Sequence, residues 1–140
     1  FSLLDEGTLY AAKFDSDGAG NGIGEWIPLM PGRGPLVDWT ESMVLIYTRG
    51  AADLVGATEM DRPEDIESNP VTGKVYVVCT NNRLRGAPGH PGTDPANPTA
   101  KNTHGHIIEI TEDGGNHAST RFRWEIFMRC GDPSKGEANT

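Results

Sequence analysis

The segment Lys-Val-Tyr-Val-Val-Cys-Thr at residues 74–80 decides the fold class of this chain. It is almost continuously apolar and rich in β-branched residues, as expected of a strand that is covered on both faces. Residues 107–111 and 121–128 predict two further strands, joined by a turn-forming Glu-Asp-Gly-Gly cluster. The second half of the chain is therefore predicted to be mainly β.

Two more strands are predicted near the start of the sequence. Residues 8–14 alternate like a half-buried strand, and residues 25–29 fit the returning strand of a mobile hairpin. The connecting loop, residues 15–22, is rich in turn formers but matches no ligand-binding loop. An EF-hand would need a polar ligand at Ala19 and a glutamate at Trp26, and a dinucleotide loop would open an apolar-periodic helix.

One helix is predicted within this β background. Between Asp38 and Gly56, apolar residues recur at three- and four-residue steps, namely at Val44, Tyr47, Ala51, Leu54 and Val55. Asp38 and Glu41 resemble a capping pair, and Gly56 is a plausible stop. Such a helix would depend on packing against the sheet and would deliver the chain directly to residues 60–64.

A guanidinium and several carboxylates crowd around one proline at residues 60–67, Met-Asp-Arg-Pro-Glu-Asp-Ile-Glu. Arg62 offers a fork of donors matched to phosphate or carboxylate oxygens, and Glu64 offers a hard oxygen ligand suited to calcium. Pro63 fixes its own φ and is predicted to push Arg62 towards an extended conformation. An isolated Arg-Pro-Glu tripeptide would instead fit a surface salt-bridge cluster.

The order of motifs around Arg62 resembles that of the PhoX-type alkaline phosphatases. The shared features are an Ala-Ala-Asp helix at residues 51–53, Met-Asp-Arg-Pro-Glu at 60–64, an Asn-Pro-x-Thr-Gly turn at 69–73, Thr-Asn-Asn at 80–82, an Asn-x-x-Gly-His-Ile-x-Glu segment at 102–109 and a Phe-x-Trp strand at 122–124. The resemblance covers most of residues 5–131. Its central motif is specific, whereas the turn alone occurs in many β proteins.

This resemblance implies that residues 1–140 are a fragment of a six-bladed β-propeller, with about two blades and one inserted helix. It implies a hydrolase that uses calcium and iron to release phosphate from phosphate monoesters and that is periplasmic or secreted. Arg62 would bind the phosphate, and Glu64 would ligate a metal ion. The isolated fragment would be inactive and would self-associate through its open propeller edges.

Several other polar residues are weaker site candidates. Asp61 and Glu67 would either orient Arg62 or lie as solvated charges, and the second interpretation is favoured. The amides of Asn81, Asn82 and Asn102 stand at strand ends or in loops, where they ligate calcium or, more often, cap turns.

Two histidines and two cysteines complete the candidates. His104 and His106 would point the same way in a regular strand, but no third ligand follows at a zinc-like spacing, so structural roles are favoured. Cys79 and Cys130 match no family motif and are predicted to be small hydrophobic residues rather than a disulfide.

Composition excludes some classes of function. A net charge of -8 and a pI of about 4.8 argue against non-specific nucleic-acid binding and favour cations. The 18 glycines and 10 prolines predict long loops, and the longest, residues 83–100, would be either functional or mobile. No apolar run reaches the roughly 18 residues that span a bilayer, and no signal peptide is recognisable.

The sequence is also compatible with two other functions. No nucleophile motif is present, so hydrolysis would be metal-assisted. A calcium-dependent propeller lactonase or phosphotriesterase is one alternative, because a fold does not determine its chemistry. The other is a non-enzymatic calcium-binding module in which Arg62 serves only as an ion-pair partner.

Overall fold

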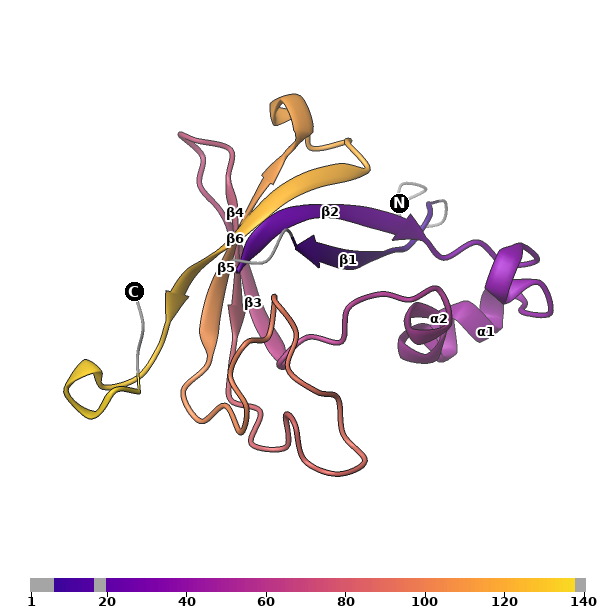
Figure 1. Cartoon of the computed structure of the whole chain (residues 1–140). Coiled ribbons are helices and arrows are strands. Elements are labelled where there is room, and N and C mark those ends of the chain that lie inside the picture. Colours follow the sequence, from indigo (N-terminus) through magenta and orange to yellow (C-terminus); the bar gives the residue numbers. More distant parts are fainter. Residues whose placement is uncertain (1–6, 17–19, 138–140) are drawn as a thin grey trace. The chain divides into compact units, whose positions relative to one another are not determined.

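Six β-strands form one sheet in the computed structural model, which describes residues 7–16 and 20–137. Their order is β1-β2-β6-β5-β4-β3 (Figure 1). The bounds are Tyr10–Ser16 for β1, Asn21–Pro28 for β2, Pro63–Ser68 for β3, Val75–Cys79 for β4, His106–Glu112 for β5 and Arg121–Arg129 for β6. The mainly-β prediction is confirmed, but the strands join one sheet rather than two separate blades.

The chain divides into two compact units whose boundary cuts through the first two strands. One unit comprises Phe1–Lys13 and Glu25–Thr58, and the other comprises Phe14–Gly24 and Glu59–Thr140. In the second unit, β3, β4, β5 and β6 pair antiparallel in sequence order. This meander contains the Met-Asp-Arg-Pro-Glu motif, which leads directly into β3.

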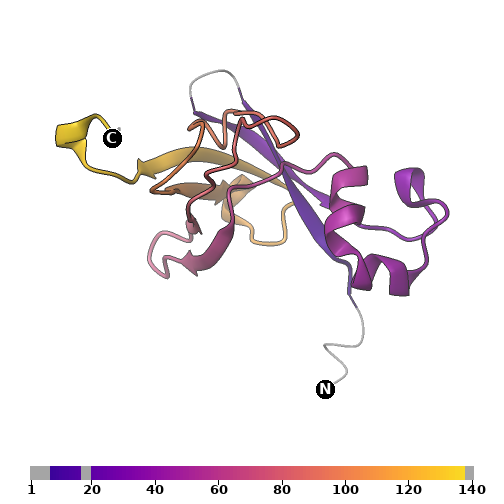
Figure 2. The ribbon, with the colours of Figure 1, turned by 90° about the horizontal axis from the view of Figure 1, so that it is seen from below.

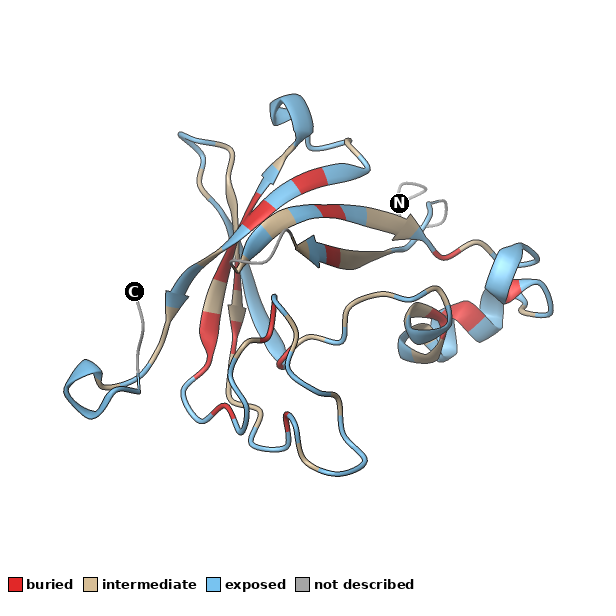
Figure 3. Ribbon diagram, viewed as in Figure 1, coloured by how far each residue is buried: buried red, intermediate tan, exposed pale blue. Residues whose placement is uncertain are grey.

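An aromatic cluster forms the centre of the second unit. Along β6, Phe122 and Trp124 are buried while their neighbours are exposed, as the alternating red bands in Figure 3 show. Phe14 packs edge-to-face on both rings, with centroid distances of 5.3 and 5.5 Å. The Trp124 indole N–H donates to the carbonyl oxygens of Asp15 and Ile23. Further buried apolar residues of the unit are Val77, Cys79, Ala96, Ile108 and Ile110.

Strand β4 is only partly covered, contrary to the prediction of two covered faces. Val77 and Cys79 are buried, but Val75, Tyr76 and Val78 are half-buried. The face of β4 that carries Tyr76 is polar rather than covered, because the Tyr76 hydroxyl donates a hydrogen bond to a Glu109 carboxylate oxygen at 2.8 Å. Both cysteines are free thiols, as predicted.

The predicted single helix is two short helices in the first unit, α1 (Glu41–Ile46) and α2 (Thr48–Leu54). Tyr47 interrupts them with φ -112° and ψ 40°. Beside it, the Thr48 hydroxyl donates to the Val44 and Leu45 carbonyls at 2.8 and 3.0 Å, so a side chain competes for helical acceptors.

The caps of these helices match the prediction at one end. Thr40, rather than Asp38, is the N-cap, and its hydroxyl oxygen accepts from the Met43 N–H at 3.3 Å. At the other end Gly56 adopts φ +78°, the left-handed conformation of a helix stop, as predicted.

The first unit has a small core of its own. Leu29, Leu36, Val44 and Ala51 form a buried cluster, with Ala11, Trp39 and Val55 packed against it. Tyr47 and Leu54 are 62% and 50% exposed, so only part of the predicted helical stripe is buried. Leu36 comes from a short 3-10 turn, Gly34–Leu36. No helix among the described residues is long and apolar enough to cross a membrane.

The N-terminal hairpin is present, with both strands shifted towards the turn: β1 covers Tyr10–Ser16 where residues 8–14 were predicted, and β2 covers Asn21–Pro28 where residues 25–29 were predicted. A Cβ on Gly22 would lie 2.1 Å from the Asp15 carbonyl oxygen, so the close approach of β1 and β2 requires glycine there. The tip of the predicted 15–22 loop, including Ala19, lies outside the described residues.

The long connection between β4 and β5 follows an irregular course (Figure 2), but several of its side chains are buried. Arg85, Ala96 and Asn97 within it are all buried. The Gly86 N–H donates to the Pro91 carbonyl at 2.7 Å, which closes a turn of this loop on itself. Of the two alternatives for residues 83–100, functional or mobile, this packing argues against the mobile one.

Candidate functional site

The backbone at Arg62 is strained, which the sequence did not predict. Arg62 has φ +46°, in the left-handed region, whereas the following proline predicted an extended conformation. A non-glycine residue there costs on the order of 1–3 kcal/mol and persists only where its surroundings impose it. Two of these constraints are the Arg62 carbonyl, which accepts from the Thr80 N–H at 3.1 Å, and its own N–H, which donates to Met60.

The Arg62 guanidinium lies at the surface beside two of the other candidate residues. Its Nη1 donates to the Asn81 side-chain oxygen at 3.1 Å, and Nη2 lies 3.6 Å from a Glu64 carboxylate oxygen. The Arg62 and Glu64 side chains are 62% and 54% exposed. An ion pair this long and exposed is weak, so both groups can engage a ligand at little cost.

Asp61 is fully buried, so the favoured interpretation as a solvated charge is wrong for this residue. Its carboxylate accepts from Arg85 Nε at 2.7 Å, Asn82 Nδ2 at 2.8 Å and Asn102 Nδ2 at 3.1 Å. A buried charge requires such partners, and three donors supply them. Glu67, by contrast, is exposed on β3 and fits the solvated interpretation.

Arg85 is a central residue that the sequence analysis missed. Its side chain is 1% exposed, and besides Asp61 it donates from Nη2 to the Glu59 carbonyl at 2.6 Å and from Nη1 to the Gly92 carbonyl at 3.0 Å. Asp94 adds a second carboxylate 3.5 Å from Nη1. The one signal in the sequence was that its loop is too long for a plain connection.

Asn97 was missed as well. Its side-chain oxygen accepts from the Asp61 backbone N–H at 2.8 Å, and its Nδ2 donates to the Glu59 carbonyl and to the Asp94 carboxylate. We call Asp61, Arg85, Asn82, Asn97 and Asn102 the buried network. It fixes both the side chain and the N–H of the residue just before Arg62.

Asn82 and Asn102, two of the asparagines predicted as turn caps or calcium ligands, form hydrogen bonds with other residues of the protein. Asn82 and Asn102 form an isolated bridge, in which the Asn82 N–H donates to the Asn102 carbonyl at 2.8 Å. The Asn102 side-chain oxygen accepts from the N–H groups of His104 and Gly105. These contacts match the turn-capping interpretation.

The two histidines lie in different environments. His106 is 2% exposed, and its Nδ1 lies 3.4 Å from Asn102 Nδ2. Burial lowers the pKa of His106, although Asp61 and the Ala96 backbone oppose the shift. The His104 ring is 41% exposed and lies 3.4 Å from Glu137. These different environments do not support the alternative of a metal pair, and they are consistent with the favoured structural roles.

Comparison with known proteins identifies the family. A family model described as "Alkaline phosphatase PhoX" matches residues 1–140. The chain belongs to the PhoX alkaline phosphatase family. It is also similar to a solved structure described as Pseudomonas fluorescens PhoX in complex with vanadate, a transition state analogue, at 42% sequence identity and a TM-score of 0.88. The match covers 95% of this chain and 24% of that chain, and no curated protein matches.

The donor chemistry of this PhoX-family segment fits one metal ligand. Glu64 presents an exposed carboxylate, which suits calcium or ferric iron. The buried Asp61 carboxylate already accepts from three side-chain donors, and burial raises the pKa of the Cys79 thiol to about 12, which disfavours the thiolate that binds metals. Within residues 7–16 and 20–137, no group of three His, Cys, Asp or Glu side chains is arranged to hold a metal ion.

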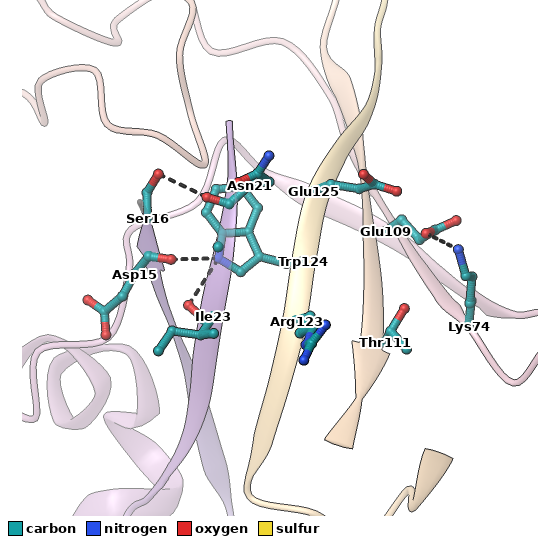
Figure 4. Close-up of a pocket in the computed structure, with 11 residues that line it drawn as sticks. Asp15, Ser16, Asn21, Ile23, Lys74, Glu109, Thr111, Arg123, Trp124 and Glu125 are labelled. Atoms are coloured by element: carbon teal, nitrogen blue, oxygen red, sulfur yellow. Dashed lines mark hydrogen bonds and ion pairs between the residues drawn. The ribbon is translucent and has the colours of Figure 1, made fainter. Parts of the chain in front are cut away.

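A separate hollow of about 770 Å³ opens in the second unit and contains none of the predicted site residues. Figure 4 shows Trp124 and the Lys74–Glu109 pair among its lining residues. The Lys74 ammonium and Glu109 carboxylate lie 2.5 Å apart. Burial alone would raise the pKa of Glu109, but hydrogen bonds from Lys74 and Tyr76 lower it below its ordinary value. Lys74 and Glu109 in the wall of the hollow are thus already paired with each other.

Proposed function

We propose that residues 1–140 form part of a longer PhoX-family phosphomonoesterase, in which Arg62 binds the phosphate and Glu64 ligates a catalytic metal ion. The observation that carries this proposal is the exposed Arg62–Glu64 pair at the start of β3, with its 3.6 Å separation. Family membership and the vanadate complex of the similar PhoX structure support the substrate class.

The proposed role of Arg62 follows from its exposure and its support. Asn81 holds one side of the guanidinium, and the rest of the planar fork can donate two parallel hydrogen bonds to a tetrahedral phosphate. Lysine at this position would supply a point charge without that geometry. The proposed contribution of Arg62 is therefore both charge neutralisation and orientation of the phosphoryl group.

Calcium and iron are the proposed cofactors. Bound metal ions would polarise the phosphoryl oxygens and supply an activated oxygen. On this proposal Glu64 provides one ligand, and parts of the longer protein provide the others. The acidic character of the segment, with a net charge of -8, makes such cations necessary, because they reverse the local sign for an anionic substrate.

The proposal extends to the fold of the whole protein, its location and the behaviour of the isolated segment. The six-stranded sheet would be a piece of a six-bladed propeller, and the whole protein would be periplasmic or secreted. The segment alone would be inactive and would self-associate, because its edge strand β3 is exposed along its whole length. Size-exclusion chromatography that showed a stable monomer would contradict the last point.

Hydrolysis of a chromogenic phosphate monoester by the full-length protein tests the proposal. We expect Arg62→Ala and Glu64→Gln to abolish most turnover while the protein stays folded, and calcium chelation to abolish it in the parent protein. Turnover of a lactone or a phosphotriester in place of the monoester would support another propeller hydrolase. No turnover of any ester would support the non-enzymatic alternative.

A further inference from the structure

We propose that Arg85 is a positioning residue for Arg62 and acts through Asp61. The inference rests on the proposed phosphate-binding role of Arg62. Arg85 itself is 1% exposed and cannot meet a substrate in this structure. Its effect on phosphate binding would be transmitted along the chain from Asp61 to the next residue.

Arg62 has a strained backbone conformation. Its φ of +46° is one that a side chain rarely adopts, and the following proline opposes it further. Such a backbone relaxes unless its neighbours are held in place. The position of the guanidinium therefore depends on whatever immobilises the adjoining residues.

Asp61 is immobilised through both its backbone and its side chain. Its N–H donates to Asn97 at 2.8 Å, and its carboxylate accepts from Arg85, Asn82 and Asn102 at 2.7, 2.8 and 3.1 Å. With these atoms fixed, the peptide that links Asp61 to Arg62 has little freedom to rotate. Arg85 makes the shortest of the four contacts.

The guanidinium end of Arg62 is also linked to the buried network. Its guanidinium is held by Asn81, and the next residue, Asn82, donates to the same Asp61 carboxylate. The backbone contact from Thr80 to the Arg62 carbonyl closes the arrangement. The buried network thus holds both the base of the Arg62 side chain and the segment that supports its tip.

A guanidinium is required at position 85 because it reaches three acceptors at once, in two separate segments of the chain. Its Nε binds Asp61, while the two terminal nitrogens bind the Glu59 and Gly92 carbonyls. A lysine would retain the charge but not this planar, three-sided geometry. Lysine is therefore expected to restore only part of the function.

A double-mutant cycle in the full-length protein tests the inference. The four proteins are the parent, Arg62→Ala, Arg85→Gln and the double variant, and the readouts are kcat and KM for a phosphate monoester and the inhibition constant of vanadate. We expect Arg85→Gln to weaken vanadate inhibition by about tenfold in the parent and to have no further effect once Arg62 is alanine. Arg85→Lys should give an intermediate value.

The outcomes separate this inference from the proposed function. An equal loss from Arg85→Gln in both backgrounds would show a general structural role and overturn the inference alone. Unchanged vanadate inhibition in Arg62→Ala would overturn the proposed function and the inference with it. Arg83→Gln, which removes an exposed arginine from the same loop, is the control and should change neither readout.

A milder variant covers the case in which Arg85→Gln does not fold. Asn97→Ala keeps the Arg85–Asp61 ion pair and removes the acceptor of the Asp61 N–H. The same cycle with Arg62→Ala should again show an effect that vanishes in the alanine background. Wild-type vanadate inhibition in a folded Asn97→Ala protein, together with a wild-type value for Arg85→Lys, would refute the positioning role.

Discussion

The consecutive residues Asp61 and Arg62 each form an ion pair, and the two pairs differ in length and in exposure to solvent. The Arg62–Glu64 pair is 3.6 Å long with side chains 62% and 54% exposed, whereas the Arg85–Asp61 pair is 2.7 Å long with side chains 1% and 0% exposed. The exposed pair contributes little to stability and can exchange its partners for a ligand. The buried pair has no such freedom, and its role is to hold the backbone from which Arg62 projects.

The largest expected effect is the loss of stability when the buried pair is broken, compared with the removal of an exposed carboxylate. Asp61→Ala leaves the Arg85 charge buried without its closest partner, so we expect a loss of about 3–5 kcal/mol in the free energy of unfolding. Glu67→Ala, which removes an exposed carboxylate from the same segment, should stay within about 0.5 kcal/mol of the parent. Urea-induced unfolding of the full-length protein measures both, and equal values would remove the distinction.

Cys79 offers a local probe of the buried pair. Burial raises the pKa of its thiol to about 12, with the Asp61 charge adding to the shift, so labelling requires local opening. In a Cys130→Ser background we expect Asp61→Ala to accelerate thiol labelling by about tenfold or more, because the buried network would open more often. Arg62→Ala should leave the rate unchanged, and an equal acceleration would show that the two pairs are not independent.

The strain at Arg62 sharpens the comparison by separating backbone from side chain. Arg62→Gly and Arg62→Ala both remove the guanidinium, but only glycine relieves the positive φ. We expect the glycine variant to be more stable than the alanine variant by about 1–2 kcal/mol. Thermal and urea unfolding of the two variants give the difference, and a more stable alanine variant would mean that this backbone is not strained.

The smallest expected effect involves the Lys74–Glu109 pair, which is intermediate in burial. Because hydrogen bonds from Lys74 and Tyr76 outweigh burial and lower the pKa of Glu109 below 4.5, this carboxylate stabilises the fold above pH 4.5. That stability is lost as the pH falls through the folded-state pKa. Lys74 is 38% exposed, so solvent screening keeps the contribution below about 1 kcal/mol.

The pH dependence of the melting temperature checks this effect. Glu109→Gln should flatten the acid limb of the curve below pH 4.5. An unaltered acid limb in Glu109→Gln would assign acid unfolding to other carboxylates.

The sequence predicted what depends on local pattern. Alternation and β-branching located five of the six strands, and the glycine at position 56 marked the end of a helix. Strand β3 (Pro63–Ser68) was missed, because all six of its residues are exposed and it carries no buried apolar pattern. The division of that helix at Tyr47 could not be predicted, because it involves the Thr48 hydroxyl at the start of α2 donating to backbone carbonyls of α1. Hydrophobic periodicity indicates which face of a helix is apolar, but it does not indicate which side-chain hydroxyl will bind a backbone carbonyl.

The candidate site was predicted only on its exposed side. Arg62 and Glu64 are neighbours in sequence, and their chemistry is legible from residue type. Arg85 lies 24 residues from Asp61 in an aperiodic loop, and Asn102 lies 41 residues away, so no local rule connects them. Such long-range polar contacts decide that Asp61 is buried and, through it, the unexpected conformation of Arg62.

The most direct test of the central claim is phosphate-monoester hydrolysis by the full-length protein with calcium and iron present, in the parent, Arg62→Ala and Glu64→Gln forms. We expect both variants to remain folded and to lose kcat/KM by at least about tenfold, because each would remove a charged contact to the phosphate or its metal. Unchanged kcat/KM in both folded variants would contradict the account and reduce the exposed pair to a surface salt bridge.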